Sequence, residues 1–264
     1  MSEGIARPSG SQLRRWGKLA TEKHRRREGL FLAEGGKVVG ELLRSRRPAE
    51  ALLISPAGEK KRDELLERVP SPIPIFRLTD REWAKLSQDP SPEGIMAVAI
   101  APPFVDPVDR LSTETGPLLL LHRVNNPNNL GALLRTAHWF GFRTVLVSKG
   151  SCDVMNPKVV RTSMGSLFHL TVMENMDLEA MLPEIRRHFR VVGSEVREGD
   201  APHPCGPATA LLMGSESHGL PTTLLGQIDE RWRIPGTGEA ESLSLPQAAA
   251  ILMYECTRTT GFAR

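Results

Sequence analysis

"PLLLLHRVNNPNNLGALLRTAHWFGFRTVLVS", residues 117–148, joins a continuous apolar run to a helical pattern and then to a second apolar run. A run such as "PLLLLHRV" is typical of a strand that is buried on both faces. Leu130, Leu133, Leu134 and Ala137 recur at helical spacing, and Gly141 suits the end of the helix. With "RTVLVS" as the next strand, the stretch has the length of a β-α-β unit and predicts an α/β fold with a parallel sheet.

Four asparagines stand in five positions around Pro127, where the first strand ends. Asparagine favours turns and helix N-caps, because its side chain bonds to the nearby backbone. A single asparagine would indicate a cap, whereas four around a proline favour a surface that binds something. The alternative is a turn with a cap, with Arg135 as an ordinary surface cation.

The first part of the chain alternates strand and helix patterns. Strands are expected at 29–34, 50–55, 73–78 and 94–100, and helices at 36–45, 58–69 and 79–88, the last capped by Thr79 or Asp80. Residues 101–117 hold four prolines and no periodicity, which favours a linker. We therefore expect a small domain at 1–100, a linker at 101–116 and a larger domain at 117–264.

The larger domain continues the alternation after residue 148. Strands are expected at 168–173, 190–195, 209–214 and 230–234, and the chain ends in a helix over 245–260. Pro246 fits that helix only within its first turn.

Composition places the protein among ordinary globular proteins, with 40% hydrophobic and 25% charged residues. No apolar run approaches the roughly 18 residues of a membrane helix, and the N-terminus lacks a signal-peptide core. Cys152, Cys205 and Cys256 are widely separated, which favours free thiols over a disulfide or a metal site. We expect a cytoplasmic protein that binds no membrane and no metal.

Positive charge is concentrated at the N-terminal end. Residues 1–47 contain twelve Lys and Arg against five Glu, a net +7 in a chain whose total is +3. Such a cluster is the electrostatic pattern of a polyanion site, and the alternative is a solvated helix face. If RNA is the polyanion, the residues expected to contact phosphates are Arg14, Arg15, Lys23, Arg25, Arg26 and Arg27.

Several common enzyme signatures are missing from the sequence. There is no G-x-G-x-x-G after a predicted first strand, no phosphate-binding G-x-x-x-x-G-K-[ST], no H-E-x-x-H and no G-x-S-x-G. A dinucleotide enzyme of Rossmann type, a nucleoside triphosphatase, a zinc enzyme and a serine hydrolase are therefore disfavoured.

Three polar or glycine-rich stretches each follow a predicted strand: "NNPNNLG" (125–131), "MGSESHGLP" (213–221) and "IPGTGEAESLSLP" (234–246). In open α/β sheets the carboxyl edge of the strands is where ligands bind. Glycines let backbone groups approach a ligand closely, which favours a neutral group such as adenine over a triphosphate. The three loops together predict one site.

In order and spacing these stretches resemble the three motifs of the SpoU-type (TrmH-like) RNA ribose methyltransferases of the SPOUT class. The family motifs read approximately N-x-G-x-x-x-R-T-A, G-x-E-x-x-G-L and I-P-(loop)-S-L-N, and the resemblance covers roughly residues 117–264. Upstream, "RRREGLFLAEGGKVVGELL" (25–43) looks like the opening of the family's small RNA-binding domain. The matching motif residues are Asn129, Gly131, Arg135, Thr136 and Ala137; Gly214, Glu216, Gly219 and Leu220; and Ile234, Pro235, Ser242 and Leu243.

The resemblance implies a knotted parallel-sheet domain, S-adenosylmethionine as methyl donor, a ribose 2′-hydroxyl of tRNA or rRNA as acceptor, and a homodimer. The residues expected to act in methyl transfer are Arg135, Asn129, Glu216 and Ser244. Those expected to bind the donor are Met213, Gly214, Ile234, Pro235 and Leu243. Those expected on the RNA side, besides the basic N-terminal residues, are Arg161 and Ser242.

Alternatives remain for several of these residues. Glu216 is otherwise a loop carboxylate, Arg161 a solvated cation, and the apolar face of the last helix (248–253) ordinary core instead of a dimer contact. The chain also departs from the family at Asn126, where an acidic residue is usual, and at Ser244 and Pro246 in the third motif. These departures favour a slow or selective enzyme. The competing interpretation is an RNA-binding protein that keeps the SPOUT fold without catalysis.

Overall fold

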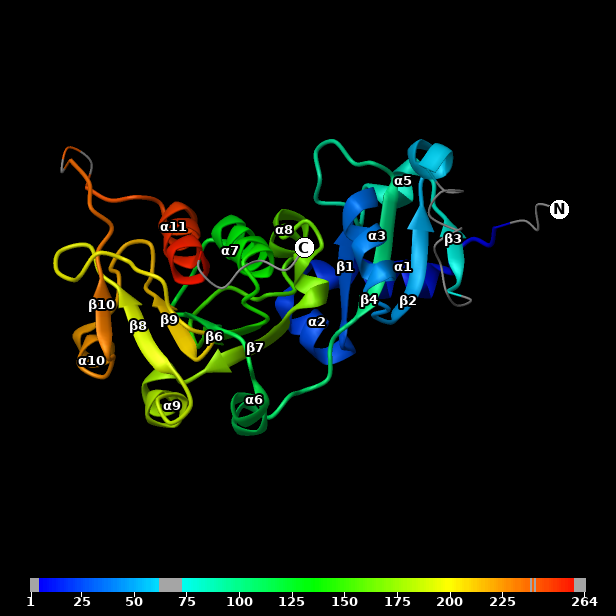
Figure 1. Cartoon of the computed structure of the whole chain (residues 1–264). Coiled ribbons are helices and arrows are strands. Elements are labelled where there is room, and N and C mark those ends of the chain that lie inside the picture. Colours follow the sequence, from blue (N-terminus) through cyan, green and yellow to red (C-terminus); the bar gives the residue numbers. More distant parts are fainter. Residues whose placement is uncertain (1–4, 62–72, 238, 240, 259–264) are drawn as a thin grey trace. The chain divides into compact units, whose positions relative to one another are not determined.

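The computed structural model describes residues 5–61, 73–237, 239 and 241–258, and the chain divides into two compact units. The first unit comprises residues 1–103 and 155–168, and the second comprises 104–154 and 169–264. Each unit is built around its own sheet (Figure 1). Residues 155–168 thus belong to the first unit, although they lie within the sequence of the second.

The first unit has a mixed four-stranded sheet in the order β1-β4-β2-β3. Strand β4 is antiparallel to both β1 and β2, and β3 is parallel to β2. Its elements are α1 (Gly10–Gly17), η1 (Lys18–Ala20), α2 (Glu22–Glu28), β1 (Leu30–Glu34), α3 (Gly36–Arg44), β2 (Ala49–Ile54), η2 (Pro56–Lys61), β3 (Ile75–Arg77), α5 (Asp80–Trp83), β4 (Ile95–Ile100) and α8 (Pro157–Thr162).

Both faces of this sheet are covered. Trp16 of α1 and Leu19 of η1 are fully buried in a cluster with Leu53 and Val98, whereas the opposite cluster contains the apolar face of α3. That opposite cluster also contains Val160 and Phe168 from the segment 155–168. The alternation of side chains along each strand explains why one sheet builds two clusters.

The predicted strands and the helix 36–45 of this unit are confirmed to within one or two residues. The helix predicted at 79–88 is confirmed only in its first turn, where Thr79 and Glu82 form a capping box. Of the helix predicted at 58–69, residues 58–61 lie in the 3-10 helix η2 and residues 62–69 lie outside the described residues.

The second unit has a six-stranded sheet in which every pair is parallel, in the order β10-β8-β9-β5-β6-β7. Its elements are α6 (Pro107–Thr113), β5 (Leu118–Leu121), α7 (Pro127–Trp139), β6 (Thr144–Ser148), η3 (Ser166–His169, which begins in the first unit), β7 (Thr171–Met176), α9 (Leu178–Ile185), β8 (Arg190–Ser194), β9 (Thr209–Met213), α10 (Thr222–Leu225), β10 (Glu230–Trp232) and α11 (Leu245–Thr257).

Helices cover both faces of this sheet. Leu118 and Leu120 of β5 pack in one cluster with α6, α9 and α10, whereas α7 and α11 pack against each other on the other face (Figure 1). All four residues of β5 are fully buried, as the apolar run predicts.

The structure differs from the predicted elements at two places along this unit. Residues 101–117 are not free of regular structure, because α6 begins at Pro107 with Asp106 as its N-cap and buries Leu111. Proline is tolerated at a first helical position, so it starts a helix here. The strand expected at 168–173 is β7 at Thr171–Met176, after the 3-10 helix η3.

Candidate active site

The three loops predicted to form a site all follow the carboxyl ends of strands in the parallel sheet. The first loop follows β5, the second follows β9, and the third follows β10. Strands β5 and β9 are neighbours, and β8 separates β9 from β10. Because all strands run the same way, the loops lie along one edge of the sheet.

A single carboxylate joins the first two loops. Glu216 accepts hydrogen bonds from the backbone N–H groups of Asn125 (3.4 Å) and Asn126 (3.3 Å) and from the Asn129 Nδ2 (3.1 Å). A carboxylate has acceptor sites on both oxygens, so one side chain can serve three donors. The structure thus brings together Asn129 and Glu216, two residues expected to act in methyl transfer.

The asparagine loop also starts helix α7. The Asn126 Oδ1 accepts from the backbone N–H of Asn128 at 2.9 Å, and Pro127 occupies the first turn. Asn126 therefore serves as N-cap in a position where the family usually has an acidic residue. Arg135 lies further along the same helix with its side chain exposed to solvent.

The second loop is a tight turn that requires glycine. Ser215 and Gly219 exchange two backbone hydrogen bonds of 3.1 and 3.0 Å. A Cβ on Gly214 would lie 2.2 Å from the Gly219 carbonyl carbon, and Gly219 itself has a φ of 63°. These two glycines of the motif therefore shape the turn that carries Glu216.

A pocket of about 360 Å³ lies between the loops after β8 and β10 and helix α11. Its wall is largely apolar, with a few polar groups, as is typical of small-molecule sites. Ile234, Pro235 and Leu243 line it as expected for donor-binding residues, and so does Ser242. Met213 and Gly214 are not among its lining residues; Met213 is fully buried, and its carbonyl accepts from the His122 N–H at 2.9 Å.

Sequence reasoning missed one side of this pocket, formed by Ser194, Glu195 and Val196. These residues follow the carboxyl end of β8, which was predicted as a strand. This stretch also lies at the carboxyl edge of the sheet, where ligands bind, but it contains no family motif. The position of β8 between β9 and β10 becomes visible only in the sheet order.

The pocket suits a small cation with an apolar body. Glu195 and Glu241 are in its wall beside Leu243 and Leu252. S-adenosylmethionine combines a positively charged sulfonium with a flat adenine, so carboxylates and apolar walls both have a counterpart in it. The residues present therefore fit the donor.

The third loop ends in the N-cap of helix α11. The Ser244 hydroxyl donates to the Gln247 Oε1 at 3.0 Å, and the Ser244 N–H donates to the same atom at 3.4 Å. Pro246 lies in the first helical turn, as predicted, where its missing N–H interrupts no hydrogen bond. Ser244 thus caps helix α11, a role that its place in the third family motif did not suggest.

The expectation of three free thiols is wrong for two of them. Cys205 and Cys256 form a disulfide across a sequence separation of 51 residues, between the segment before β9 and the end of α11. Sequence spacing alone does not show that folding brings these segments together. Cys152 is free, and burial raises its pKa to about 12, so the thiol stays protonated and unreactive.

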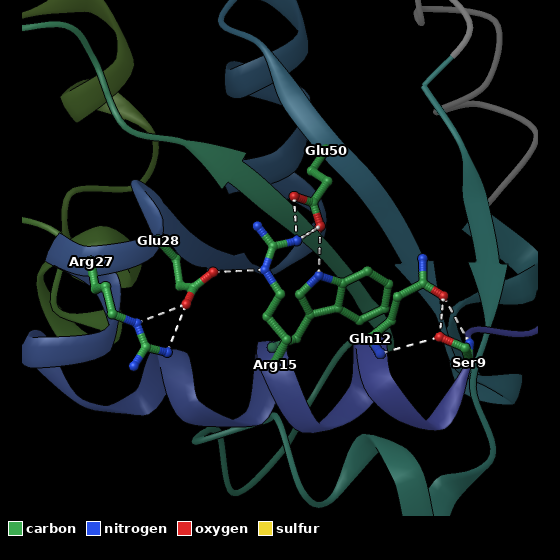
Figure 2. A network of polar contacts seen from close by, with 7 residues as sticks. Ser9, Gln12, Arg15, Arg27, Glu28 and Glu50 are labelled. Atoms are coloured by element: carbon green, nitrogen blue, oxygen red, sulfur yellow. Dashed lines mark hydrogen bonds and ion pairs between the residues drawn. The ribbon is translucent and has the colours of Figure 1, made fainter.

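Most of the predicted phosphate-contacting arginines of the N-terminal helices are engaged within the first unit (Figure 2). The Arg15 guanidinium contacts Glu28 at 2.8 Å and Glu50 at 2.9 Å, and the Trp16 indole N–H donates to the same Glu50 at 2.9 Å. Arg27 contacts Glu28 at 2.7 Å. These arginines tie α1 and α2 to each other and to β2.

The remaining predicted cations differ in their surroundings. Arg25 is buried and donates to the Leu19 carbonyl at 2.8 Å, Arg26 pairs with Glu22 at 2.8 Å, and Arg161 pairs with Asp89 at 3.4 Å. Arg14 and Lys23 are exposed, and neither forms an ion pair with another described residue. They are the two predicted cations of α1 and α2 whose charge is unpaired in the described structure.

Two other kinds of feature are absent from the described residues. No group of three or more His, Cys, Asp or Glu side chains in them is arranged to hold a metal ion. None of their helices has the length and apolar character that crossing a bilayer requires.

Comparisons with known proteins agree with the motifs. A profile of the SpoU rRNA methylase family matches residues 117–254, and a profile of the MRM3-like substrate binding domain matches residues 11–97. The chain is 31% identical over 258 residues to the 23S rRNA (guanosine(2553)-2′-O)-methyltransferase RlmP of Bacillus subtilis strain 168, with 95% of this chain and 97% of that protein covered.

Two solved structures are similar over nearly the whole chain. A TrmH-family protein from Porphyromonas gingivalis is 33% identical with a TM-score of 0.82, covering 96% of this chain and 99% of that one. The SpoU methyltransferase AviRb from Streptomyces viridochromogenes, solved with AdoMet, is 26% identical with a TM-score of 0.82, covering 97% of this chain and 100% of that one.

The predicted fold class, a parallel-sheet SPOUT domain with a smaller N-terminal α/β domain, is confirmed. So are the predicted enzyme class, an RNA 2′-O-ribose methyltransferase, and its donor, S-adenosylmethionine. The chain belongs to the SpoU rRNA methylase family.

Proposed function

We propose that this protein methylates a ribose 2′-hydroxyl of ribosomal RNA at the carboxyl edge of its parallel sheet. The observation that carries the proposal is the clamp in which Glu216 holds Asn125, Asn126 and Asn129 beside the edge that also forms the pocket. B. subtilis RlmP is named for a guanosine and a Streptomyces viridochromogenes relative, 28% identical, for a uridine of 23S rRNA. We therefore assign the ribose as the methylated group and do not assign the identity of the base.

The donor occupies the pocket between the loops after β8 and β10 and helix α11 in this proposal. Ile234, Pro235 and Leu243 hold it, together with Glu195 and Trp232, which also line the pocket. When bound, S-adenosylmethionine would supply a methyl group on a positively charged sulfur for transfer to the ribose oxygen, with S-adenosylhomocysteine as the leaving group and the hydroxyl proton passing to solvent. The protein then needs to align the two reactants and exclude water.

Arg135 acts on the RNA. Its guanidinium stays protonated in proteins, so it is unsuited to remove the hydroxyl proton. It is exposed on α7, roughly 9 Å along the helix axis from Asn129 by helical rise, and its long side chain can reach back over the asparagine loop. We assign it to a phosphate next to the target ribose, where it orients the hydroxyl.

The first unit binds the RNA in this proposal. Its match to a substrate binding domain over residues 11–97 supports this, as do the unpaired cations Arg14 and Lys23. In this proposal the predicted domain at 1–100 binds the RNA and the predicted domain at 117–264 transfers the methyl group, while residues 155–168 belong to the first compact unit. Because ribosomal RNA is the proposed substrate, we place the protein in the cytoplasm.

We also propose a homodimer formed through α7 and α11. Trp139 is 80% exposed, Tyr254 is 50% exposed and Ile251 is 39% exposed, whereas Ala249, Leu252 and Met253 of α11 are buried within the unit. The half-buried Phe140 ring, just after α7, meets the Tyr254 ring of α11 edge to face at 6.3 Å, so the ends of the two helices contribute to one surface. A two-fold axis would bury this surface against its copy.

Light scattering tests the dimer. The wild-type chain should have twice its monomer mass at micromolar concentration, and Trp139→Glu should be monomeric. The matched control is Phe104→Glu, which changes another exposed aromatic (82% exposed) outside this surface and should remain dimeric. A monomeric wild type would contradict the dimer.

The methyl transfer itself is tested with purified protein, transcribed 23S rRNA and tritium-labelled donor. Digestion of the RNA to nucleosides and mass spectrometry should identify a 2′-O-methylnucleoside. Label on a base, or no label with any ribosomal or transfer RNA, would contradict the proposed reaction.

A further inference from the structure

A cluster of charged and aromatic side chains lies behind one wall of the donor pocket. Trp232 of β10 lines the pocket and is only 1% exposed. Its indole N–H donates to the Glu230 Oε1 at 2.7 Å, from two residues earlier on the same strand. A buried indole N–H needs such a partner, and the partner fixes the orientation of the ring.

The same oxygen of Glu230 also binds His203. The His203 Nε2 lies 2.7 Å from the Glu230 Oε1, and the His203 ring meets the Trp232 ring edge to face at 5.2 Å. The other carboxylate oxygen, Oε2, lies 2.7 Å from the Arg190 Nη2 of β8. Glu230 therefore connects the pocket wall to two cations.

The surroundings of His203 favour a doubly protonated ring. Its Nδ1 faces the Pro204 carbonyl at 3.0 Å, and its Nε2 faces the Glu230 carboxylate. Both neighbours can only accept hydrogen bonds, and only the imidazolium donates from both nitrogens. Loss of the proton would leave a nitrogen lone pair facing an oxygen.

The electrostatics agree with this geometry. The hydrogen bond to the Pro204 carbonyl and then the contact with Glu230 raise the pKa of His203, while Arg190, the other charged group facing it, opposes the shift. Burial acts to raise the pKa of Glu230, but the hydrogen bonds from Trp232 and His203 outweigh it, so the pKa lies below its usual value. The charged contact between protonated His203 and the Glu230 carboxylate is therefore present below the raised pKa of His203 and is lost as the pH rises through it.

The segment that precedes His203 is hydrogen-bonded to β10 and to the residue that follows it. The Asp200 N–H donates to the Arg231 carbonyl and the Arg233 N–H donates to the Asp200 carbonyl, each at 2.9 Å. The N–H of Glu195, in the pocket wall, donates to the Trp232 carbonyl at 2.9 Å. Loss of the proton from His203 is therefore expected to affect the position of Trp232.

We propose that Glu230 is a positioning residue for the methyl donor, which acts by orienting Trp232 in the pocket wall, and that protonated His203 strengthens this effect so that donor binding weakens as the pH rises. This inference rests on the assignment of the pocket to the donor in the proposed function.

The test is calorimetric titration of the full-length protein with S-adenosylhomocysteine between about pH 6 and about pH 9. We expect the wild-type Kd to rise about threefold to fivefold across this range and the Kd of His203→Gln to be insensitive to pH. Glu230→Gln should raise the Kd about fivefold at the low end of the range. Because His203 is partly exposed, its replacement leaves the core intact.

A double-mutant cycle shows whether Glu230 acts through the indole. Trp232→Phe keeps an aromatic ring, although a smaller one, and removes the indole N–H, so adding Glu230→Gln to it should not raise the Kd further. The matched control is Glu198→Gln, an exposed carboxylate of the same segment that contacts Arg231 at 3.8 Å, and it should bind like the wild type. Independent, additive effects of Glu230→Gln and Trp232→Phe would overturn the proposal, as would a pH dependence that persists in His203→Gln.

A second pair of variants separates this inference from the pocket assignment. Ala248→Phe fills the pocket, whereas Ala250→Phe alters the same helix at a position that is not among the lining residues. Ala248→Phe should abolish binding and Ala250→Phe should not. If Ala248→Phe binds normally, the pocket assignment and this inference both fall; if it abolishes binding but Glu230→Gln has a wild-type Kd, only this inference falls.

Discussion

The N-terminal helices and the asparagine loop both hold dense polar side chains, yet the structure uses them in opposite ways. In α1 and α2 several arginines are paired with carboxylates of their own unit, as Arg15 and Arg27 are with Glu28 (Figure 2). At the asparagine loop, Glu216 from the second loop accepts hydrogen bonds from backbone and amide N–H groups, and Arg135 stays exposed.

The difference shows that charge density alone does not locate a binding surface. An arginine that is paired within its own unit must break that pair to bind a phosphate, whereas an unpaired one need not. Loops at the carboxyl edge of a parallel sheet face solvent for topological reasons, whatever their charge. The predictions below test this contrast, in order of decreasing effect.

Arg135→Ala should have the largest effect. Methyl transfer should fall at least about 1,000-fold, a loss of ~4 kcal/mol of transition-state stabilisation, because the target ribose is no longer oriented. Single-turnover transfer of labelled methyl measures the loss, and calorimetry should show unchanged donor affinity. The matched control is Arg143→Ala, an exposed arginine just before β6 at the opposite edge of the same sheet, which should be fully active.

Glu216→Gln should have an intermediate effect. The amide cannot accept from all three donors of the asparagine loop, so we expect methyl transfer to fall about 30-fold, which corresponds to ~2 kcal/mol. The control is Glu184→Gln on α9, a carboxylate paired with Arg187 on the other face of the sheet. Equal activity of the two variants would mean that the clamp does not organise the site.

Replacing Arg14 and Lys23 should have a smaller effect, and it should change RNA binding alone. Substituting both by Ala should weaken RNA binding several-fold and lower its salt slope by about one per lost phosphate contact. Arg27→Ala, which removes a paired arginine from the same helices, should leave the slope unchanged. Filter binding at several salt concentrations distinguishes these results, and equal slopes for both variants would remove the distinction between paired and unpaired cations.

Deletion of residues 1–28 would not serve for this comparison. It would remove Trp16 and Leu19, which are fully buried in the core of the first unit. Replacing a buried Trp by Ala already costs about 3–5 kcal/mol of unfolding free energy, so a loss of RNA binding would report unfolding.

Ser244→Asn should have the smallest effect. Asparagine is an N-cap as good as serine, so α11 keeps its start, and the longer amide restores the family's usual third motif. Methyl transfer should be equal to the wild type or up to about tenfold faster, since one added hydrogen bond contributes about 1 kcal/mol. A variant that is slower than the wild type would show that the capping role of Ser244 is needed in the site.

The sequence was informative where local pattern and position agree. The buried run of β5, the helical spacing of α7 and the glycines of the second loop each have one physical interpretation, and the structure has the expected elements there. The clamp by Glu216 was not predictable, because it joins residues 87 to 91 positions apart. The same is true of the Cys205–Cys256 disulfide and of the pocket wall after β8, which both depend on the order of strands in the sheet.

The roles of the N-terminal arginines could not be predicted from the sequence for a different reason. Residue counts give the net charge, but Glu28 and Glu50 are identified as the partners of Arg15 only by the packing of α1 and α2 on the sheet. In the same way, α6 was hidden by its prolines, although Asp106 and Pro107 together form a good helix start.

The central claim is that the carboxyl edge of the parallel sheet transfers a methyl group to a ribose of ribosomal RNA. The most direct measurement is a transcriptome-wide map of 2′-O-methyl sites in cells that lack the gene, complemented with the wild type, Arg135→Ala or Arg143→Ala. We predict that a ribosomal RNA site is lost on deletion, returns with the wild type and Arg143→Ala, and stays unmethylated with Arg135→Ala. An unchanged map on deletion, or full restoration by Arg135→Ala, would contradict the account.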